Sequence, residues 1–286
     1  MAGPANFLDL PAELSDPATA RTVVLPVPYE ATTTYGRGTA AGPSAIVAAS
    51  AQVEWFDEEL GAEVVRAGVA TLPPVEPAAT PEEQMARIRA AAAPVLEDGR
   101  LLLSLGGEHT ITVALVAAAA EAHPGLSVLQ IDAHADLREA YQGSRLSHAC
   151  VMRRVLEITP RIAQVGVRSY SREEREQCPR QAGRFITPRR VREDPGWVEA
   201  ALELLGETVY VTVDVDGLDP SEAPGVGTPE PGGLHWGEAT ALLRRVAAER
   251  RVVAADVVEV RPIPPSNVTE FLAARLACKI IAYTQA

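Results

Sequence analysis

Short apolar runs alternate with longer amphipathic stretches along almost the whole chain. Runs such as Leu101–Leu105 place apolar residues on both faces, which is typical of a parallel strand covered by helices on both sides. The longer stretches repeat apolar residues at helical spacing. We expect strands at 23–28, 101–105, 126–132, 162–167, 209–214 and 252–258, and helices at 43–56, 81–97, 111–122, 148–158, 195–205, 236–249 and 268–284.

Local signals agree with this pattern. Pro81 stands where a first-turn proline is tolerated, Thr80 can cap the same helix, and Gly99 follows its end. No internal repeat or long linker divides the chain, and the proline-rich stretch 72–81 is interpreted as a loop. The alternation therefore predicts an α/β fold: a single three-layer αβα domain over residues 1–286 with a mainly parallel sheet.

Composition and charge narrow the functional classes. The formal net charge is −12, which disfavours nucleic acid as a partner and suits cations. No apolar stretch reaches the ~20 residues that cross a bilayer, so we expect no membrane contact. The first residues lack the basic and apolar regions of a signal peptide, and the cysteines form no CxxC pair. These features predict a cytoplasmic protein.

One polar cluster closes the predicted strand 126–132. Asp132, His134 and Asp136 follow one another at a spacing of two residues, with Ala133 and Ala135 between them. In an extended chain this spacing turns two carboxylates and an imidazole to one side. A capped strand end with incidental polar residues would explain one aspartate, but it does not explain three ligand-type residues in this register.

Two further segments repeat the arrangement. Asp214 and Asp216 end another buried strand and precede a turn rich in glycine and proline, in which Asp219 is interpreted as a turn residue. The segment SLGGEHT ends a third strand and places His109 at the start of a helix. Its two glycines allow the close backbone approach that a crowded site needs.

Charge indicates what these segments would bind. Four converging aspartates would repel one another or take up protons unless cations neutralise them. Two divalent cations would balance them, and oxygen ligands with two imidazoles and no thiolate favour Mn²⁺, with Fe²⁺, Co²⁺ or Zn²⁺ as replacements. Two metals about 3.5–4 Å apart activate a water molecule, so the predicted chemistry is hydrolysis.

In their order and spacing, GGEH, DAHAD and DVDGLDP…PGVGTPEPGG resemble the signature segments of the ureohydrolase (arginase/agmatinase) family. The resemblance covers nearly the whole chain, including GRGTAAGPSAI and DVVEVRP. It implies an arginase/deacetylase-like fold, two Mn²⁺ ions per subunit, and hydrolysis of a small cationic guanidino substrate to urea and an amine. It also implies a homo-oligomer, a trimer or a hexamer.

The resemblance also implies roles for individual residues. The metal ligands would be His109, Asp132, His134, Asp136, Asp214 and Asp216. Glu259 matches the family glutamate that pairs with the guanidinium, a planar partner for a carboxylate. Thr228 falls at a position that contacts the same group, and His148 matches a histidine that carries protons near the metals.

Structural interpretations stand beside these roles. Glu259 could be a charge at a strand end, and His148 could serve packing alone. His123 and His235 lie outside every motif and are interpreted as helix-end or surface residues. Cys150, close to His148, is interpreted as a small buried side chain rather than a nucleophile.

The substrate tail is less constrained than the metal site. Glu108 and Thr110 replace the family's usual aspartate and serine. Because neither position is a metal ligand in the family pattern, we expect changes in the contacts around the ligands rather than a loss of activity. The chain lacks the asparagine-containing loop of arginases, and SHACVMRR resembles the agmatinase branch. We therefore expect agmatine to be cleaved to urea and putrescine.

Other substrates and classes stay open. Guanidinobutyrate, N1-aminopropylagmatine and arginine are alternatives within the same reaction, since nearby arginines could bind a carboxylate (Arg138, Arg145, Arg168 and Arg172). A non-urea amidohydrolase on the deacetylase fold is disfavoured by the paired aspartate motifs. A non-catalytic paralogue is disfavoured because all six expected ligands are present.

Overall fold

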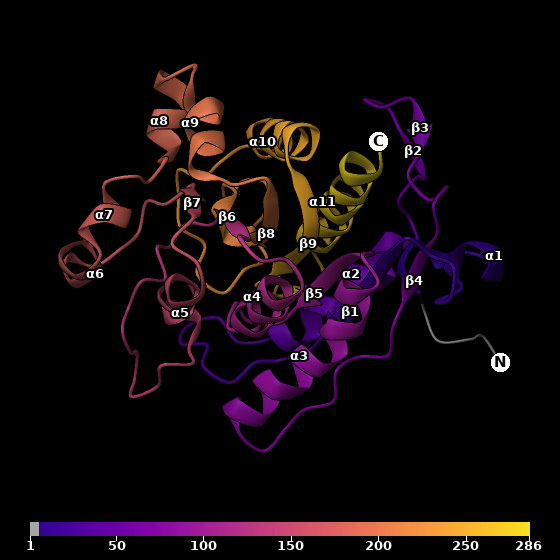
Figure 1. Ribbon diagram of the computed structural model, residues 1–286, viewed down its shortest axis with the longest axis horizontal. Coiled ribbons are helices and arrows are strands. Elements are labelled where there is room, and N and C mark those ends of the chain that lie inside the picture. The colour runs from indigo at the N-terminus through magenta and orange to yellow at the C-terminus, as the bar shows by residue number, and fades with distance from the viewer. Residues whose placement is uncertain (1–5) are drawn as a thin grey trace.

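A seven-stranded parallel sheet forms the centre of the computed structural model, which describes residues 6–286 (Figure 1). Its strands are β1 (Thr22–Val27), β4 (Val69–Thr71), β5 (Leu101–Gly106), β6 (Ser127–Ile131), β7 (Ile162–Val165), β8 (Thr208–Asp214) and β9 (Arg251–Val258). Their order is β4-β1-β5-β9-β8-β6-β7, and every neighbouring pair is parallel. The predicted sheet is confirmed, and only the short edge strand β4 was not predicted.

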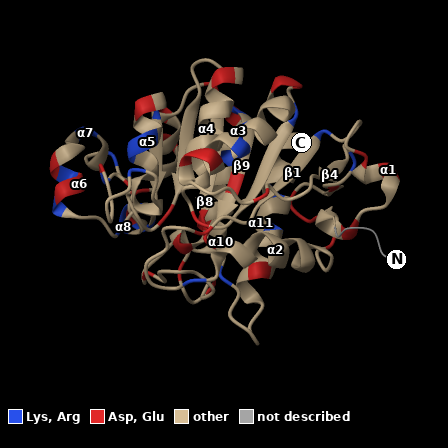
Figure 2. Ribbon diagram, turned by 90° about the horizontal axis from the view of Figure 1, so that it is seen from below, with Lys and Arg blue, Asp and Glu red and all other residues tan. Residues whose placement is uncertain are grey.

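Helices cover both faces of the sheet and complete the predicted three layers (Figure 2). One face packs against α2 (Gly42–Ser50), α9 (Trp197–Leu204), α10 (Trp236–Glu249) and α11 (Val268–Gln285). The other packs against α3 (Pro81–Glu97), α4 (Ile111–Ala122) and α5 (Val151–Ile158). Alternate strand residues enter the two cores, as with Leu102 and Leu103 of β5, which explains the unbroken apolar runs.

The predicted helix 43–56 is wrong beyond Ser50. The chain turns there and forms a small antiparallel hairpin of β2 (Phe56–Asp57) and β3 (Ala62–Glu63). Asp57 in this hairpin forms an ion pair with the buried Lys279 of α11, with 2.8 Å between Asp57 Oδ2 and Lys279 Nζ.

Several short elements were not predicted, because each spans too few residues to show a period. They are η1 (Phe7–Asp9), α1 (Ala12–Ser15), η2 (Thr39–Ala41), α6 (Arg172–Gln177), α7 (Pro179–Ala182), α8 (Pro188–Glu193) and η4 (Val215–Gly217). The predicted helix 148–158 is divided into η3 (His148–Cys150) and α5. The expectation about a signal peptide rests partly on residues 1–5, which lie outside the described residues.

The strand order decides where the polar segments meet. β5, β9, β8 and β6 are consecutive in the middle of the sheet, and each is followed directly by one of the predicted site segments. Because the strands are parallel, these segments emerge at one edge, where ligands collect in open α/β sheets. None of the helices in residues 6–286 has the length and apolar character needed to span a membrane.

Candidate metal centre

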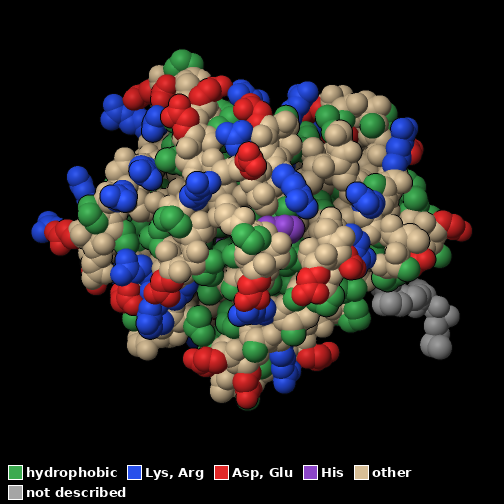
Figure 3. Space-filling view, viewed as in Figure 1, with side chains coloured by type: hydrophobic (Ala, Val, Ile, Leu, Met, Phe, Trp, Pro, Cys, Tyr) green, Lys and Arg blue, Asp and Glu red, His purple; other side chains and the backbone are tan. Residues whose placement is uncertain are grey.

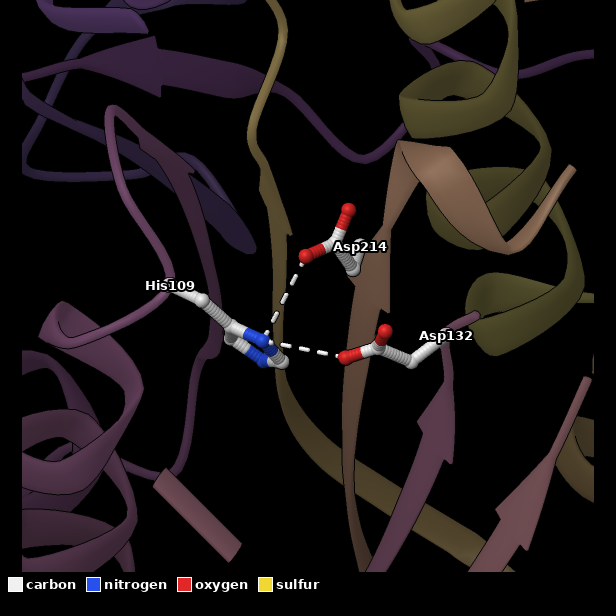
Figure 4. Close-up of side chains that lie close together, drawn as sticks. All are labelled: His109, Asp132 and Asp214. Atoms are coloured by element: carbon white, nitrogen blue, oxygen red, sulfur yellow. Dashed lines mark ion pairs between the residues drawn. The ribbon is translucent and has the colours of Figure 1, made fainter. Parts of the chain in front are cut away.

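One cluster of buried ligand-type side chains surrounds His109 (Figure 4). Its Nδ1 atom lies 3.2 Å from Oδ2 of Asp132 and 3.5 Å from Oδ2 of Asp214. Asp136 Oδ2 is 3.0 Å from the same nitrogen. Three chain segments thus converge on one point, and the ligand atoms of His109, Asp132 and Asp214 are close enough together to hold one cation.

A second cluster shares Asp132 and adds His134 and Asp216. His134 Nδ1 lies 3.1 Å from Asp216 Oδ2 and 3.6 Å from Asp132 Oδ1. Because Asp132 belongs to both clusters, its carboxylate can bridge two cations. The structure therefore brings together all six residues predicted as ligands.

The backbone at the strand ends holds these side chains in place. Asp132 Oδ1 accepts a hydrogen bond from the His134 N–H at 2.6 Å, and Asp214 Oδ1 accepts one from the Asp216 N–H at 3.0 Å. Asp136 and Glu259 have φ angles of 52° and 64°, in the left-handed region that side chains other than glycine seldom adopt. Such strain costs about 1–3 kcal/mol and is typical of functional sites.

His109 is oriented by a chain of hydrogen bonds behind it. Its Nε2 atom lies 2.9 Å from Oγ1 of Thr212, and that hydroxyl donates its single hydrogen to Oδ1 of Asp256 at 2.6 Å. Thr212 must therefore accept from Nε2–H, which directs Nδ1 at the three carboxylates. Nδ1 is buried and makes no hydrogen bond of acceptable geometry, although it faces the three carboxylates. Burial opposes a charged His109, but Asp132 and Asp136 together raise its pKa well above the usual range, so a cation bound there would take the place of a proton.

The electrostatics of the clusters also fit divalent cations. Burial and the charge of Asp132 raise the pKa of Asp136 to about 7. Burial, with the charges of Asp216 and Asp132, raises the pKa of Asp214 well above its usual range. Burial opposes a charged His134, but the charges of Asp216 and Asp132 and their hydrogen bonds together outweigh burial and raise the pKa of His134 to about 12. The cluster would hold protons by itself, and cations would displace them.

A cavity of about 200 Å³ lies over the two clusters and is lined by the other predicted site residues, Glu259, Thr228 and His148. Glu259 Oε1 accepts the His109 main-chain N–H at 2.7 Å, and Thr228 Oγ1 donates to Asp216 Oδ2 at 3.3 Å. Burial raises the pKa of Glu259 well above its usual range and lowers that of His148. Figure 3 shows histidine near the middle of the face turned to the viewer.

Sequence reasoning did not predict the loop that borders this cavity. Residues 33–36 line it, and Gly36 lies so close to Gly227 that a Cβ atom would come within 2.6 Å of the Gly227 carbonyl oxygen. The buried Glu108 accepts hydrogen bonds from the N–H groups of Ala31 and Thr32 at 2.7 and 2.6 Å. No periodic signal marks this loop, so its contacts could not be found from the sequence.

The residues interpreted as structural lie at helix ends, in a turn or in the core. His123 and His235 flank α4 and α10, and Asp219 accepts the N–H groups of Ser221, Gly232 and Gly233 in a turn. Cys150 is buried, and burial raises the pKa of its thiol to about 11, which is unfavourable for a nucleophile.

Comparison with known proteins identifies the family. Residues 20–282 match the Arginase family over most of the chain. The chain is a member of the arginase family. A ureohydrolase of Synechocystis sp. named for N(1)-aminopropylagmatine is 38% identical over 289 residues, covering 98% of this chain and 94% of the relative. A protein of the same name from Thermus thermophilus is 40% identical over 244 residues, covering 85% and 83%.

A solved structure supports the same assignment. The agmatine ureohydrolase of Thermoplasma volcanium superimposes with a TM-score of 0.89 at 32% identity, covering 100% of this chain and 96% of the other. The arginase-family fold and a hydrolase acting on guanidino or amidino groups are thereby confirmed. The expectation of agmatine as substrate is not confirmed, because the relatives at 38% and 40% identity are named for N(1)-aminopropylagmatine instead.

Proposed function

We propose that this arginase-family enzyme hydrolyses the guanidino group of N1-aminopropylagmatine, releasing urea and the triamine spermidine. This replaces agmatine, our expectation from the sequence, with one of its alternatives. The main support is the identity of 38% and 40% to ureohydrolases named for that compound. The reaction breaks the bond between the guanidinium carbon and the alkyl nitrogen; water supplies the oxygen of urea and a proton for the amine.

The two clusters fit a pair of Mn²⁺ ions, one held by His109, Asp132, Asp136 and Asp214 and the other by His134 and Asp216 with the shared Asp132. The buried Nδ1 atom of His109, which lacks a hydrogen-bond partner, supports this assignment. When bound, such a pair supplies a water molecule with a pKa lowered toward neutrality. All other steps fall to side chains of the chain itself.

Glu259 is proposed to bind the guanidinium. It lines the same cavity as both clusters, and its Oε1 atom is held by the His109 N–H at 2.7 Å. A carboxylate pairs with a planar guanidinium through two parallel hydrogen bonds. The positive charge of the bound substrate would also compensate the burial that disfavours an ionised Glu259. Thr228, beside Asp216, is proposed to contact the same group.

His148 is proposed to give a proton to the departing amine. It lines the cavity, and burial lowers its pKa, so it is neutral at pH 7 until it takes up a proton during turnover. An imidazole whose pKa lies near or below the working pH can accept a proton from the attacking water and pass it to the amine.

The space beside the clusters suits a long tail. A second cavity of about 240 Å³ shares His134, Asp136, Arg138 and Ala149 with the first and continues to Glu174. Arg138 would attract a carboxylate tail, but its Nε atom lies 4.0 Å from Glu174 Oε2 and its guanidinium lies over the Tyr141 ring at 5.2 Å. Because Arg138 is engaged in these contacts, we favour a cationic tail over a guanidino acid.

The test is urea release by the Mn²⁺-loaded enzyme from N1-aminopropylagmatine, agmatine, arginine and guanidinobutyrate. We expect kcat/KM for N1-aminopropylagmatine to exceed that for agmatine by about tenfold or more, because a tail contact worth about 1.4 kcal/mol gives that factor. Equal or better turnover of agmatine would restore our first expectation. Better turnover of guanidinobutyrate would contradict the proposed cationic tail.

We further propose that the enzyme acts in the cytoplasm as a homo-oligomer, a trimer or hexamer, with neither nucleic acid nor membrane as a partner. The support is the family resemblance and the net charge of −12. Light scattering of the purified enzyme tests the assembly, and a monomer would contradict it.

A further inference from the structure

A buried carboxylate behind the cavity organises the loop that borders it. Glu108 is fully buried, and its two oxygens accept four hydrogen bonds at 2.6–2.8 Å, from the Ala31 and Thr32 N–H groups and the Thr32 and Thr110 hydroxyls. These partners satisfy the carboxylate without a cation. Among them, only the Thr32 hydroxyl also touches a residue to which we assign a part in the reaction.

That second contact is with His148. Oγ1 of Thr32 lies 3.1 Å from Nδ1 of the His148 ring and also accepts the His148 main-chain N–H at 3.1 Å. A hydroxyl has a single hydrogen and two lone pairs. The hydrogen of Thr32 goes to Oε1 of Glu108 at 2.8 Å, so both contacts from His148 must be donated to Thr32.

This count of donors and acceptors at the Thr32 hydroxyl determines the tautomer of the His148 imidazole. Nδ1 must carry the hydrogen that it donates to Thr32, so in the neutral ring Nε2 keeps the free lone pair. Among the described residues no side chain hydrogen-bonds Nε2, and His148 lines the cavity over the metal clusters. The ring is also held from the side by Tyr141, whose ring meets it edge-on at 5.7 Å between centroids.

We propose that Thr32, anchored by Glu108, is a positioning residue that fixes the Nδ1–H tautomer of His148 and so leaves Nε2 as the atom that takes up and delivers the proton. This inference rests on the proposed function, in which His148 protonates the amine. In the opposite tautomer Nε2 would already carry a hydrogen and could not collect the proton released by the attacking water.

The test compares Thr32→Val, which keeps the shape but removes the hydroxyl, with Thr32→Ser, which keeps the hydroxyl. We expect Thr32→Val to lower kcat about tenfold or more with little change in KM, part of the ~10²–10⁴-fold that general acid–base catalysis contributes. Thr32→Ser should restore most of the lost kcat. A rise in KM with unchanged kcat would instead indicate that Thr32 only shapes the loop, and would overturn the proposal.

A double-mutant comparison separates this inference from the role of His148 itself. In a His148→Gln background, adding Thr32→Val should cause no further loss of kcat, because the residue through which Thr32 acts is gone. Additive losses would refute the inference. If His148→Gln alone keeps full activity, the proposed role of His148 fails. If His148→Gln is impaired and Thr32→Val is not, that role stands and only the part of Thr32 fails.

A measurement without turnover provides independent evidence. The ¹⁵N chemical shifts of a neutral imidazole distinguish its tautomers, and His148→Gln assigns the signal among the five histidines. The wild-type enzyme and Thr32→Ser should show His148 protonated at Nδ1, and Thr32→Val should show a shift toward the Nε2–H form. An Nε2–H tautomer in the wild-type enzyme would overturn the proposal.

Discussion

Removal of the Thr212 hydroxyl is a direct test of the orientation of His109. Thr212→Val keeps the branched shape of the side chain but abolishes the contact from His109 Nε2 at 2.9 Å and the one to Asp256 at 2.6 Å, together with a long contact to the Thr112 hydroxyl at 3.5 Å. His109 then loses the hydrogen-bond acceptor that fixes its tautomer. The form of the ring with an unprotonated Nδ1 is no longer favoured over the other tautomer. Loss of such a partner behind a metal ligand typically costs about 10–100-fold in metal affinity.

Thr112→Val is the matched control. Thr112 also donates to Asp256, at 2.7 Å, but among the described residues its side chain makes no hydrogen bond to the imidazole of His109, and it meets the Thr212 hydroxyl only at 3.5 Å. Both substitutions leave Asp256 with one donor fewer, and each should lower the free energy of unfolding of the metal-free protein by about 1–3 kcal/mol. The difference between the two variants therefore isolates the effect on His109.

Calorimetric titration of the metal-free proteins with Mn²⁺ provides the measurement. We expect one of the two binding steps to weaken by about 10–100-fold in Thr212→Val, equivalent to about 1.4–2.7 kcal/mol, while Thr112→Val binds close to wild type. Equal weakening in both variants would refute the reasoning, because the loss would then come from Asp256 or from general loosening. Unchanged binding in Thr212→Val would show that the ring is fixed by other means.

Three further changes test other parts of the structure. Removal of metal by a chelator should lower the thermal midpoint, because the aspartates are left without cations, and Mn²⁺ should restore it with two ions per chain; a single ion would contradict the paired clusters. Glu259→Gln should lower kcat/KM by about 10²-fold or more while Mn²⁺ binding is kept, since the guanidinium loses its charged partner; unchanged kinetics would exclude Glu259 from binding it. Asp57→Asn should cost about 2–4 kcal/mol of unfolding free energy at pH 7, because Lys279 keeps only Glu58 and Glu59. Burial opposes ionisation of Asp57, but Lys279 holds its pKa below 3.8. The ion pair therefore contributes to the free energy of unfolding above pH 3.8. Chemical unfolding at lower pH should show the difference between Asp57→Asn and the wild-type protein disappear.

The ligand set could be predicted because its pattern is local. Asp132, His134 and Asp136 occupy alternate positions directly after the end of β6, and parallel strands deliver their carboxyl ends to the same edge of the sheet. Neither step requires knowledge of which strands are neighbours. The fold class was predicted for the same reason, since apolar runs and helical periods can be recognised within about 20 residues.

The residues that orient the ligands depend on strand register instead. Asp256 lies within an apolar strand, where the sequence indicates only an isolated buried charge. Its role in orienting His109 becomes visible only in the structure, where the pairing of β8 with β9 places Thr212 beside Asp256. Thr32 lies 76 residues from Glu108 and 116 from His148 along the chain, and no local pattern connects such positions.

Two histidines of the site are held by the same arrangement. In each, a threonine hydroxyl accepts from one ring nitrogen and passes its single hydrogen to a buried carboxylate: His109 to Thr212 to Asp256, and His148 to Thr32 to Glu108. A carboxylate in direct contact would favour the imidazolium and keep the ring protonated. The hydroxyl in between fixes the tautomer while keeping that negative charge one residue away. It therefore leaves Nε2 of His148 with a free lone pair for a proton. At His109 the lone pair of Nδ1 becomes available to a cation only when cations neutralise Asp132 and Asp136, which otherwise raise the pKa of this ring against the effect of burial.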